Sequence, residues 1–84
     1  MNKNIILIDV RSPEEFASGH TKGAINFDVQ RLGQGEMPDL AKSAKLKLYC
    51  RSGGRAELAK NILKQHGFSD VENLGGIDRI KDQP

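Results

Sequence analysis

One short segment of this 84-residue chain gathers the residue types that nucleophilic chemistry requires. It consists of six consecutive residues: Cys50, Arg51, Ser52, Gly53, Gly54 and Arg55. Cys50 is the only cysteine in the sequence, which excludes an intrachain disulfide and a CxxC metal or redox pair. The segment therefore combines a free thiol with two cationic side chains and a flexible backbone.

The backbone of this segment is suited to holding an anion. Gly53 and Gly54 allow the chain to curl so that successive N–H groups point into one concavity. A helix that starts directly behind the glycines adds about half a positive charge at its N-terminus. Arg51 and Arg55 supply two permanent positive charges, and guanidinium groups offer paired donors to oxyanions. We therefore predict an anion-binding loop.

The same positive field acts on the thiol of Cys50. A free cysteine has a pKa of about 8.5, and helix N-termini or nearby arginines lower it to about 3.5 to 7.5. The alternative is that Cys50 only fills the end of a strand while the glycines make a turn. Two glycines, two arginines and a helix start together favour a reactive nucleophile. Ser52 is expected either to donate a hydrogen bond to a group bound in this loop or to cap the following helix.

The elements that position this loop can be read from apolar patterns. We predict four strands, over 4–10, 24–27, 46–49 and 71–74, the first of them buried on both faces and the third running directly into Cys50. A capping box at Ser12 and Glu15, with a proline between them, predicts a helix that ends near Gly19. An apolar stripe predicts a second helix over 54–66, ended by a left-handed Gly67.

Other segments carry weaker patterns. A loop with a helical turn or two is expected over 30–38, a short helix over 39–43, a tight turn at Gly75 and Gly76, and a last helical turn over 77–81. Strands that alternate with helices indicate one α/β domain over residues 1–84 with a largely parallel sheet. Cys50 then lies at the carboxyl end of a strand, where α/β sheets bind ligands.

Composition excludes several classes of function. The chain is 37% hydrophobic and 29% charged, which is typical of a soluble protein and not of a membrane protein. Its net charge of +2 is scattered among acids, so we expect no nucleic acid partner. No phosphate loop or zinc-spaced histidine pair occurs, and we expect neither a metal nor a cofactor. A cytoplasmic location is the default, and a periplasmic one follows if a leader was removed before Met1.

With these residues in view, the chain resembles the rhodanese family over about residues 5–80. The loop from Cys50 to Arg55 matches the family's C-R-S-G-x-R form at every specified position. Three further segments are similar to family patterns: Ile8-Asp9-Val10-Arg11 with Glu14-Glu15-Phe16, Gly19-His20 with Gly23-Ala24-Ile25-Asn26, and Val71-Glu72-Asn73-Leu74-Gly75-Gly76.

The resemblance implies a compact α/β domain, with helices on both faces of its sheet, that transfers sulfur. Cys50 would take sulfane sulfur from thiosulfate as a persulfide and pass it to cyanide, a thiol or a protein acceptor. Arg51 is expected to steer thiosulfate, whereas Arg55 lies inside the helix and is expected to be tied to structure. A loop of six residues resembles sulfur-transferring members, because related phosphatases and arsenate reductases have one residue more.

Two matters remain open from the sequence. Asp9 and Arg11 follow a strand and project to one face, where we expect structural pairing or loop support rather than catalysis. A non-catalytic persulfide carrier or partner-binding module is an alternative function. An arsenate reductase or phosphatase that uses the same loop is a less favoured one.

Overall fold

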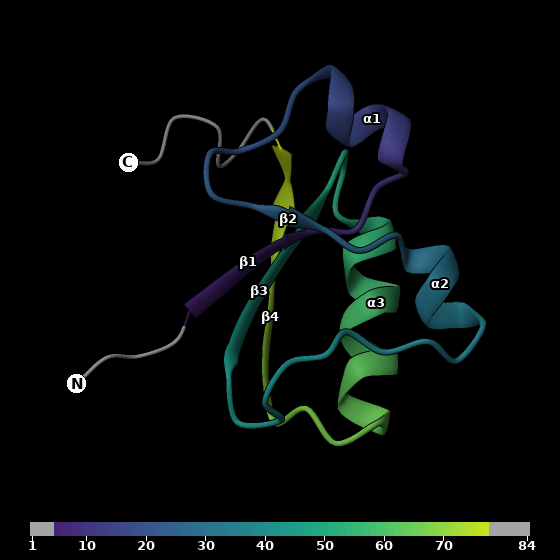
Figure 1. Cartoon of the computed structure of the whole chain (residues 1–84), viewed down its shortest axis with the longest axis vertical. Helices are drawn as coiled ribbons and strands as arrows, with labels where there is room; N and C mark the ends of the chain where they lie inside the picture. The colour runs from purple at the N-terminus through teal and green to yellow at the C-terminus, as the bar shows by residue number, and fades with distance from the viewer. Residues whose placement is uncertain (1–4, 78–84) are drawn as a thin grey trace.

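The computed structural model describes residues 5–77, and these residues form a four-stranded sheet with three helices (Figure 1). The elements in chain order are β1 (Ile5–Asp9), α1 (Pro13–Ser18), β2 (Ile25–Asn26), α2 (Val29–Gly33), β3 (Lys45–Cys50), α3 (Gly54–Gln65) and β4 (Asp70–Gly76). Strands and helices alternate as predicted.

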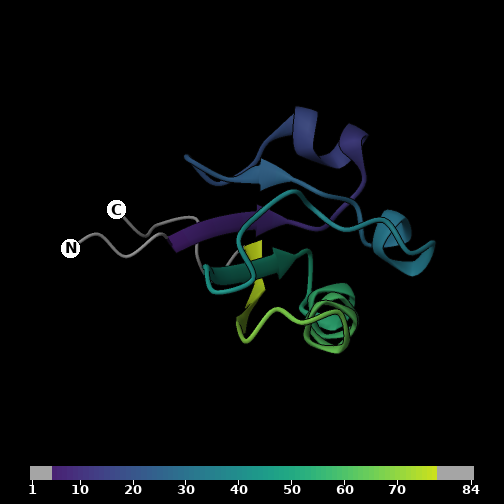
Figure 2. The same ribbon diagram turned by 60° about the horizontal axis from the view of Figure 1, so that its bottom comes forward.

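All the strand pairs are parallel, and the strand order is β2-β1-β3-β4. β3 is a central strand between β1 and β4, and its last residue is Cys50. Figure 2 shows β1 and β3 side by side, with α3 beyond the end of β3. The prediction of an α/β fold with a parallel sheet is confirmed, and the reactive segment lies at the carboxyl end of a central strand.

The hydrophobic core lies on one face of this sheet. Residues that alternate along β1 and β3, among them Ile8, Leu46 and Leu48, are buried there against Ala59 and Leu63 of α3. The first strand is less buried than predicted, because Ile5 is 55% exposed. Because α3 packs on this core, its first turn is held at the end of the loop from Cys50 to Arg55.

The opposite face of β3 carries Lys45, Lys47 and Tyr49. The lysines pair with Asp70 and Glu72 of β4, in exposed or half-exposed positions. Nearer the carboxyl end, the segment after α1 reaches this face, where the backbone N–H of Thr21 donates to the hydroxyl of Tyr49 at 3.0 Å. The non-helical segment after α1 therefore covers part of the face opposite α3.

Local sequence signals explain how α1 begins and how α3 ends. The hydroxyl of Ser12 accepts from the backbone N–H of Glu15, whose side chain accepts from the Ser12 N–H, and this completes the predicted capping box. Gly67 has a φ of 99°, the left-handed conformation predicted after α3. The Phe68 N–H then donates to the Leu63 carbonyl, which returns Phe68 to the core.

Of two predictions between β2 and β3, one is confirmed and one was wrong. The helical turn or two expected within the loop over 30–38 is α2 (29–33), which Asp28 caps by accepting from the Gln30 N–H. The short helix predicted over 39–43 does not form. This stretch makes local turns instead, in which the Leu40 N–H donates to the Pro38 carbonyl and the Ala44 N–H to the Ala41 carbonyl.

The glycine pair near the end of the described chain also differs from the prediction. Gly75 and Gly76 belong to β4 instead of forming a tight turn, and Gly76 pairs with Cys50. Most of the helical turn predicted over 77–81 lies outside the described residues. Among the helices of the described part, none has the length and apolar character needed to cross a membrane.

Candidate active site

Cys50 is held between a strand and the first turn of a helix. It ends β3, and only three residues separate it from the start of α3 at Gly54. The backbone N–H of Gly53 points back and donates to the Cys50 Sγ at 2.9 Å. Gly53 adopts a φ of 102°, a left-handed conformation that residues with a side chain rarely take. The loop therefore aims a backbone donor at the sulfur, as the glycines predicted.

Burial and hydrogen bonding act in opposite directions on the pKa of the Cys50 thiol. Burial raises this pKa, because it penalises the charged thiolate. Backbone N–H groups around the sulfur lower it, and they belong to Ala56, Ser52, Gly53 and Arg55. Their combined effect is the larger, so the pKa of Cys50 lies below its usual value. The geometry thus favours the nucleophilic form of the thiol.

The exposure of Cys50 differs from that of a typical reactive cysteine. The residue has 0% of its surface exposed and joins the hydrophobic core. The flanking residues Arg51 and Ser52 are exposed. The thiol is therefore covered by the residues around it, while the start of the loop that follows is open to solvent.

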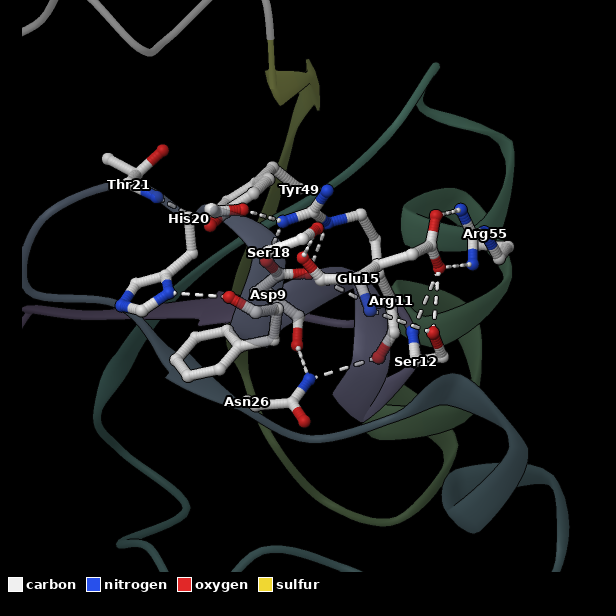
Figure 3. A network of polar contacts seen from close by, with 12 residues as sticks. Asp9, Arg11, Ser12, Glu15, Ser18, His20, Thr21, Asn26, Tyr49 and Arg55 are labelled. Atoms are coloured by element: carbon white, nitrogen blue, oxygen red, sulfur yellow. Dashed lines mark hydrogen bonds and ion pairs between the residues drawn. The ribbon is translucent and has the colours of Figure 1, made fainter.

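The two arginines of the loop have different surroundings. Arg55 makes a two-fold hydrogen bond to Glu15 of α1, from Nη1 to Oε1 at 2.8 Å and from Nη2 to Oε2 at 3.1 Å (Figure 3). Arg51 is exposed, and among residues 5–77 no ion pair involves it. The charge of Arg51 is thus open to solvent, whereas the charge of Arg55 is already paired.

Glu15 is a functional contact that sequence reasoning missed. The capping box identified it only as a helix residue, and nothing local shows that it also meets Arg55, forty residues away. Hydrogen bonds from Arg55, and then from the backbone and hydroxyl of Ser12, lower its pKa from 4.5 to about 2. Glu15 therefore links the first turn of α1 to the first turn of α3, behind the loop.

This link predicts a specific pH dependence of stability. Because folding depresses the pKa of Glu15, its contribution is fully present above about pH 4.5 and is lost as the pH falls through about 2. We expect Glu15→Gln to lower the free energy of unfolding at neutral pH by about 1 to 2 kcal/mol, a value reduced for partial exposure. Urea unfolding at several pH values measures this difference.

The exposed neighbour Glu14 provides a matched control, since Glu14→Gln makes the same chemical change one residue away. The stability difference between parent and Glu15→Gln should shrink between pH 4.5 and about 2, whereas Glu14→Gln should follow the parent throughout. A Glu15→Gln deficit that stays constant across this range would contradict the assignment.

A buried ion pair lies at the end of β1, beside the loop. The Asp9 carboxylate is fully buried and accepts three hydrogen bonds from the Arg11 side chain and one from its backbone N–H, at 2.7 to 3.0 Å. The hydrogen bonds and charge of Asp9 raise the pKa of Arg11, although burial opposes this shift. Arg11 also donates to the Gly19 carbonyl at 2.7 Å. The Asn26 amide donates to the carbonyls of Asp9 and Arg11, both at 3.0 Å (Figure 3). The pair joins β1, β2 and the end of α1.

The described part of the chain contains no cluster of side chains that could bind a metal ion. Between residues 5 and 77, no group of three histidine, cysteine, aspartate or glutamate side chains is placed to hold an ion. The reactive groups are instead a thiol, backbone amides and one exposed guanidinium. These are the components of nucleophilic chemistry on a small anionic substrate.

Comparison with known proteins places this fold and loop in one family. The model of the rhodanese-like domain matches residues 1–83, and the chain belongs to that family. Among curated proteins, thiosulfate sulfurtransferase PspE of Escherichia coli (strain K12) is 38% identical over 76 residues, which cover 87% of this chain and 71% of that protein. A sulfurtransferase of Allochromatium vinosum is 34% identical over 76 residues, which cover 89% of this chain and 70% of that protein.

Solved structures agree with this assignment. A rhodanese with anions from E. coli superimposes with a TM-score of 0.79 and 34% identity, over 95% of this chain and 94% of that one. The human single-domain sulfurtransferase TSTD1 superimposes with a TM-score of 0.78 and 27% identity, over 87% and 76% of the two chains. Rhodanese folds of about this size thus share the same arrangement of sheet and helices.

Other relatives are much longer than this chain. The tRNA uridine(34) hydroxylase of Acaryochloris marina is 36% identical over 80 residues, but the match covers only 26% of that protein. The chain therefore spans about a quarter of these hydroxylases, and the similarity reaches one part of them.

Proposed function

We propose that this chain is a thiosulfate sulfurtransferase in which Cys50 carries the transferred sulfur as a persulfide. The observation that supports this most directly is the Gly53 N–H donated to the Cys50 Sγ at 2.9 Å, within a loop that begins at a central strand. Relatives of similar length that carry sulfurtransferase in their names support the same reaction class. The tRNA uridine(34) hydroxylases do not support hydroxylation by this chain to the same degree, because the match covers only about a quarter of their length.

The first half-reaction forms the persulfide. The Cys50 thiolate attacks the outer sulfur of thiosulfate, a bond forms between the two sulfur atoms, and the sulfur–sulfur bond of thiosulfate breaks. The electron pair of that bond leaves with sulfite. The outer sulfur keeps the negative charge that it carried in thiosulfate, and sulfite leaves as a dianion, so that charge is conserved. Backbone N–H groups of the loop stabilise the anion before and after transfer.

The second half-reaction returns the enzyme to its starting state. Cyanide attacks the terminal sulfur, thiocyanate leaves, and the electron pair of the persulfide bond returns to Cys50 as a thiolate. A thiol acceptor would take the same sulfur and become a persulfide itself. The two half-reactions never require both substrates together, which is the pattern of ping-pong kinetics.

Loop length and charge favour sulfur over phosphate as the transferred group. A loop one residue longer would place an arginine at position 56, but this chain has Ala56, which is fully buried in α3. Arg55 is held by Glu15. A single exposed guanidinium suits the sulfonate end of thiosulfate better than a phosphoryl group, whose transfer relies on close charge neutralisation.

Arg51→Ala should weaken the capture of thiosulfate. Removing an exposed charge near the loop is expected to lower kcat/KM for thiosulfate about ten-fold, mainly through KM, and to reduce its dependence on ionic strength. Arg31→Ala is the matched control, because Arg31 is exposed on α2 and pairs with Glu36. Steady-state kinetics at low and high salt measure both variants. Equal losses in the two variants would argue against a role for Arg51.

Turnover separates the proposed function from its alternatives. Parent protein with thiosulfate and cyanide should form thiocyanate continuously, with parallel lines in double-reciprocal plots. A single equivalent of thiocyanate per protein molecule, without further turnover, would instead support a persulfide carrier. Release of phosphate from an aryl phosphate, or reduction of arsenate, would support the phosphatase or reductase alternative.

A further inference from the structure

The carbonyl of Gly53 is held from outside the loop by a side chain of β4. Asn73 donates from Nδ2 to the Gly53 carbonyl at 3.1 Å and to the Glu57 Oε1 at 3.0 Å. Its Oδ1 accepts from the Gly75 N–H at 2.8 Å. One half-buried amide thus joins the loop, the first turn of α3 and the end of β4.

Gly53 needs such an external contact more than another residue would. Glycine has the widest backbone freedom of any residue, and Gly53 stands at the start of α3 without a side-chain cap of its own. Its carbonyl is fixed by two donors, the Glu57 N–H at 3.0 Å and the Asn73 amide. Its N–H is the group that donates to the Cys50 Sγ. This N–H and this carbonyl lie in neighbouring peptide planes that meet at the Gly53 Cα. Anchoring the carbonyl therefore restricts rotation about the φ and ψ angles of Gly53, and so the direction in which the N–H points.

The shape of β4 brings Asn73 to this point. Between the pairs Leu48 with Asn73 and Cys50 with Gly76, one residue on β3 faces two on β4. This irregularity has Gly75 at a φ of 98°, and the Asn73 Oδ1 closes it by accepting from the Gly75 N–H. A β-carbon on Gly53 would lie 3.3 Å from the Gly75 Cα, so the loop and the strand are in close contact.

We infer that Asn73 is a positioning residue: by anchoring the Gly53 carbonyl, it restrains the backbone of Gly53 so that its N–H stays directed at the sulfur of Cys50. This inference rests on the proposed function, in which the sulfur must be held as an anion. Asn73 acts through Gly53 and does not touch the reacting atoms. Its amide is neutral, so it can contact both a carbonyl and the Glu57 carboxylate without adding negative charge beside the thiolate.

The test follows alkylation of Cys50 by iodoacetamide as a function of pH, which reports on one thiol because the chain has one cysteine. Asn73→Ala removes all three contacts. Asn73→Asp keeps an acceptor for the Gly75 N–H but loses the donor to Gly53. We expect both variants to raise the pH midpoint of alkylation by about half to one unit, and to slow the reaction below the midpoint about three- to ten-fold.

Asn26→Ala is the matched control, because Asn26 also bridges two backbone carbonyls but does so beside β1. It should keep the parent's midpoint even if it lowers stability. Asn73 variants that share the parent's midpoint, or an Asn26→Ala midpoint that moves equally, would overturn the inference. If neither Asn73 variant folds, NMR of the parent decides the question. The chemical shift of the Gly53 backbone amide must then change with pH at the same midpoint as the alkylation of Cys50.

The test is independent of sulfur transfer, since iodoacetamide replaces the sulfur donor. A parent protein that alkylates as expected but ignores thiosulfate would overturn the proposed function and leave the role of Asn73 intact. Normal sulfur transfer with unshifted Asn73 variants would do the reverse.

Discussion

Gly76→Ala is expected to reduce sulfur transfer about a hundred-fold, because the added methyl group displaces the backbone of the active-site loop. A β-carbon on Gly76 would lie 2.5 Å from the Arg51 carbonyl oxygen and 3.4 Å from the Ser52 Cα. Both neighbours are backbone atoms that follow Cys50 directly, so no flexible side chain can yield. Either the loop or the end of β4 must move.

Steady-state turnover of thiosulfate and cyanide, corrected for the folded fraction, measures this loss. Gly33→Ala makes the same change at the end of α2, where a β-carbon meets no atom within 4 Å. It should retain the parent's turnover. A fully active and folded Gly76→Ala would show that the contact between β4 and the loop does not shape the site.

Arg11→Met is expected to have the largest effect on stability. It leaves the Asp9 carboxylate fully buried without its guanidinium partner, and an orphaned buried charge costs about 3 to 5 kcal/mol. Small domains are stable by only about 5 to 15 kcal/mol in total, so the variant should be close to unfolding. Urea unfolding at neutral pH measures the free energy of unfolding.

Two comparisons isolate the cause of that loss. Lys45→Met breaks the exposed pair with Asp70 and should cost far less than Arg11→Met, because water already solvates both partners. The double variant Asp9→Leu with Arg11→Met removes both buried charges and should recover much of the lost stability. If Arg11→Met costs no more than Lys45→Met, the buried pair does not support the fold.

The sequence predicted the order of elements because their signals are local. Apolar runs marked the strands, a capping box marked the start of α1, and an apolar stripe marked α3. The helical turn expected over 30–38 formed as α2, but its bounds could not be predicted, because five residues are too few for a clear periodicity. The helix expected over 39–43 was wrong, because this stretch forms local turns from Pro38 to Leu40 and from Ala41 to Ala44.

Within the site, the sequence predicted the loop and its thiol but not the groups that hold them. Glu15 and Asn73 contact the loop from α1 and β4, and a residue's own neighbours in sequence carry no sign of such partners. The full burial of Cys50 was also unexpected, since a strand end can be open or covered. Arg55 was expected to be tied to structure, but the sequence did not identify its partner, Glu15 of α1.

The most direct test of the account is the mass of the intact protein after incubation with thiosulfate. The parent should gain one sulfur atom, and cyanide should remove it with release of thiocyanate. Cys50→Ser should gain nothing, because it lacks the only thiol in the chain. A parent mass that stays unchanged, or a sulfur gain that persists in Cys50→Ser, would contradict persulfide formation on Cys50.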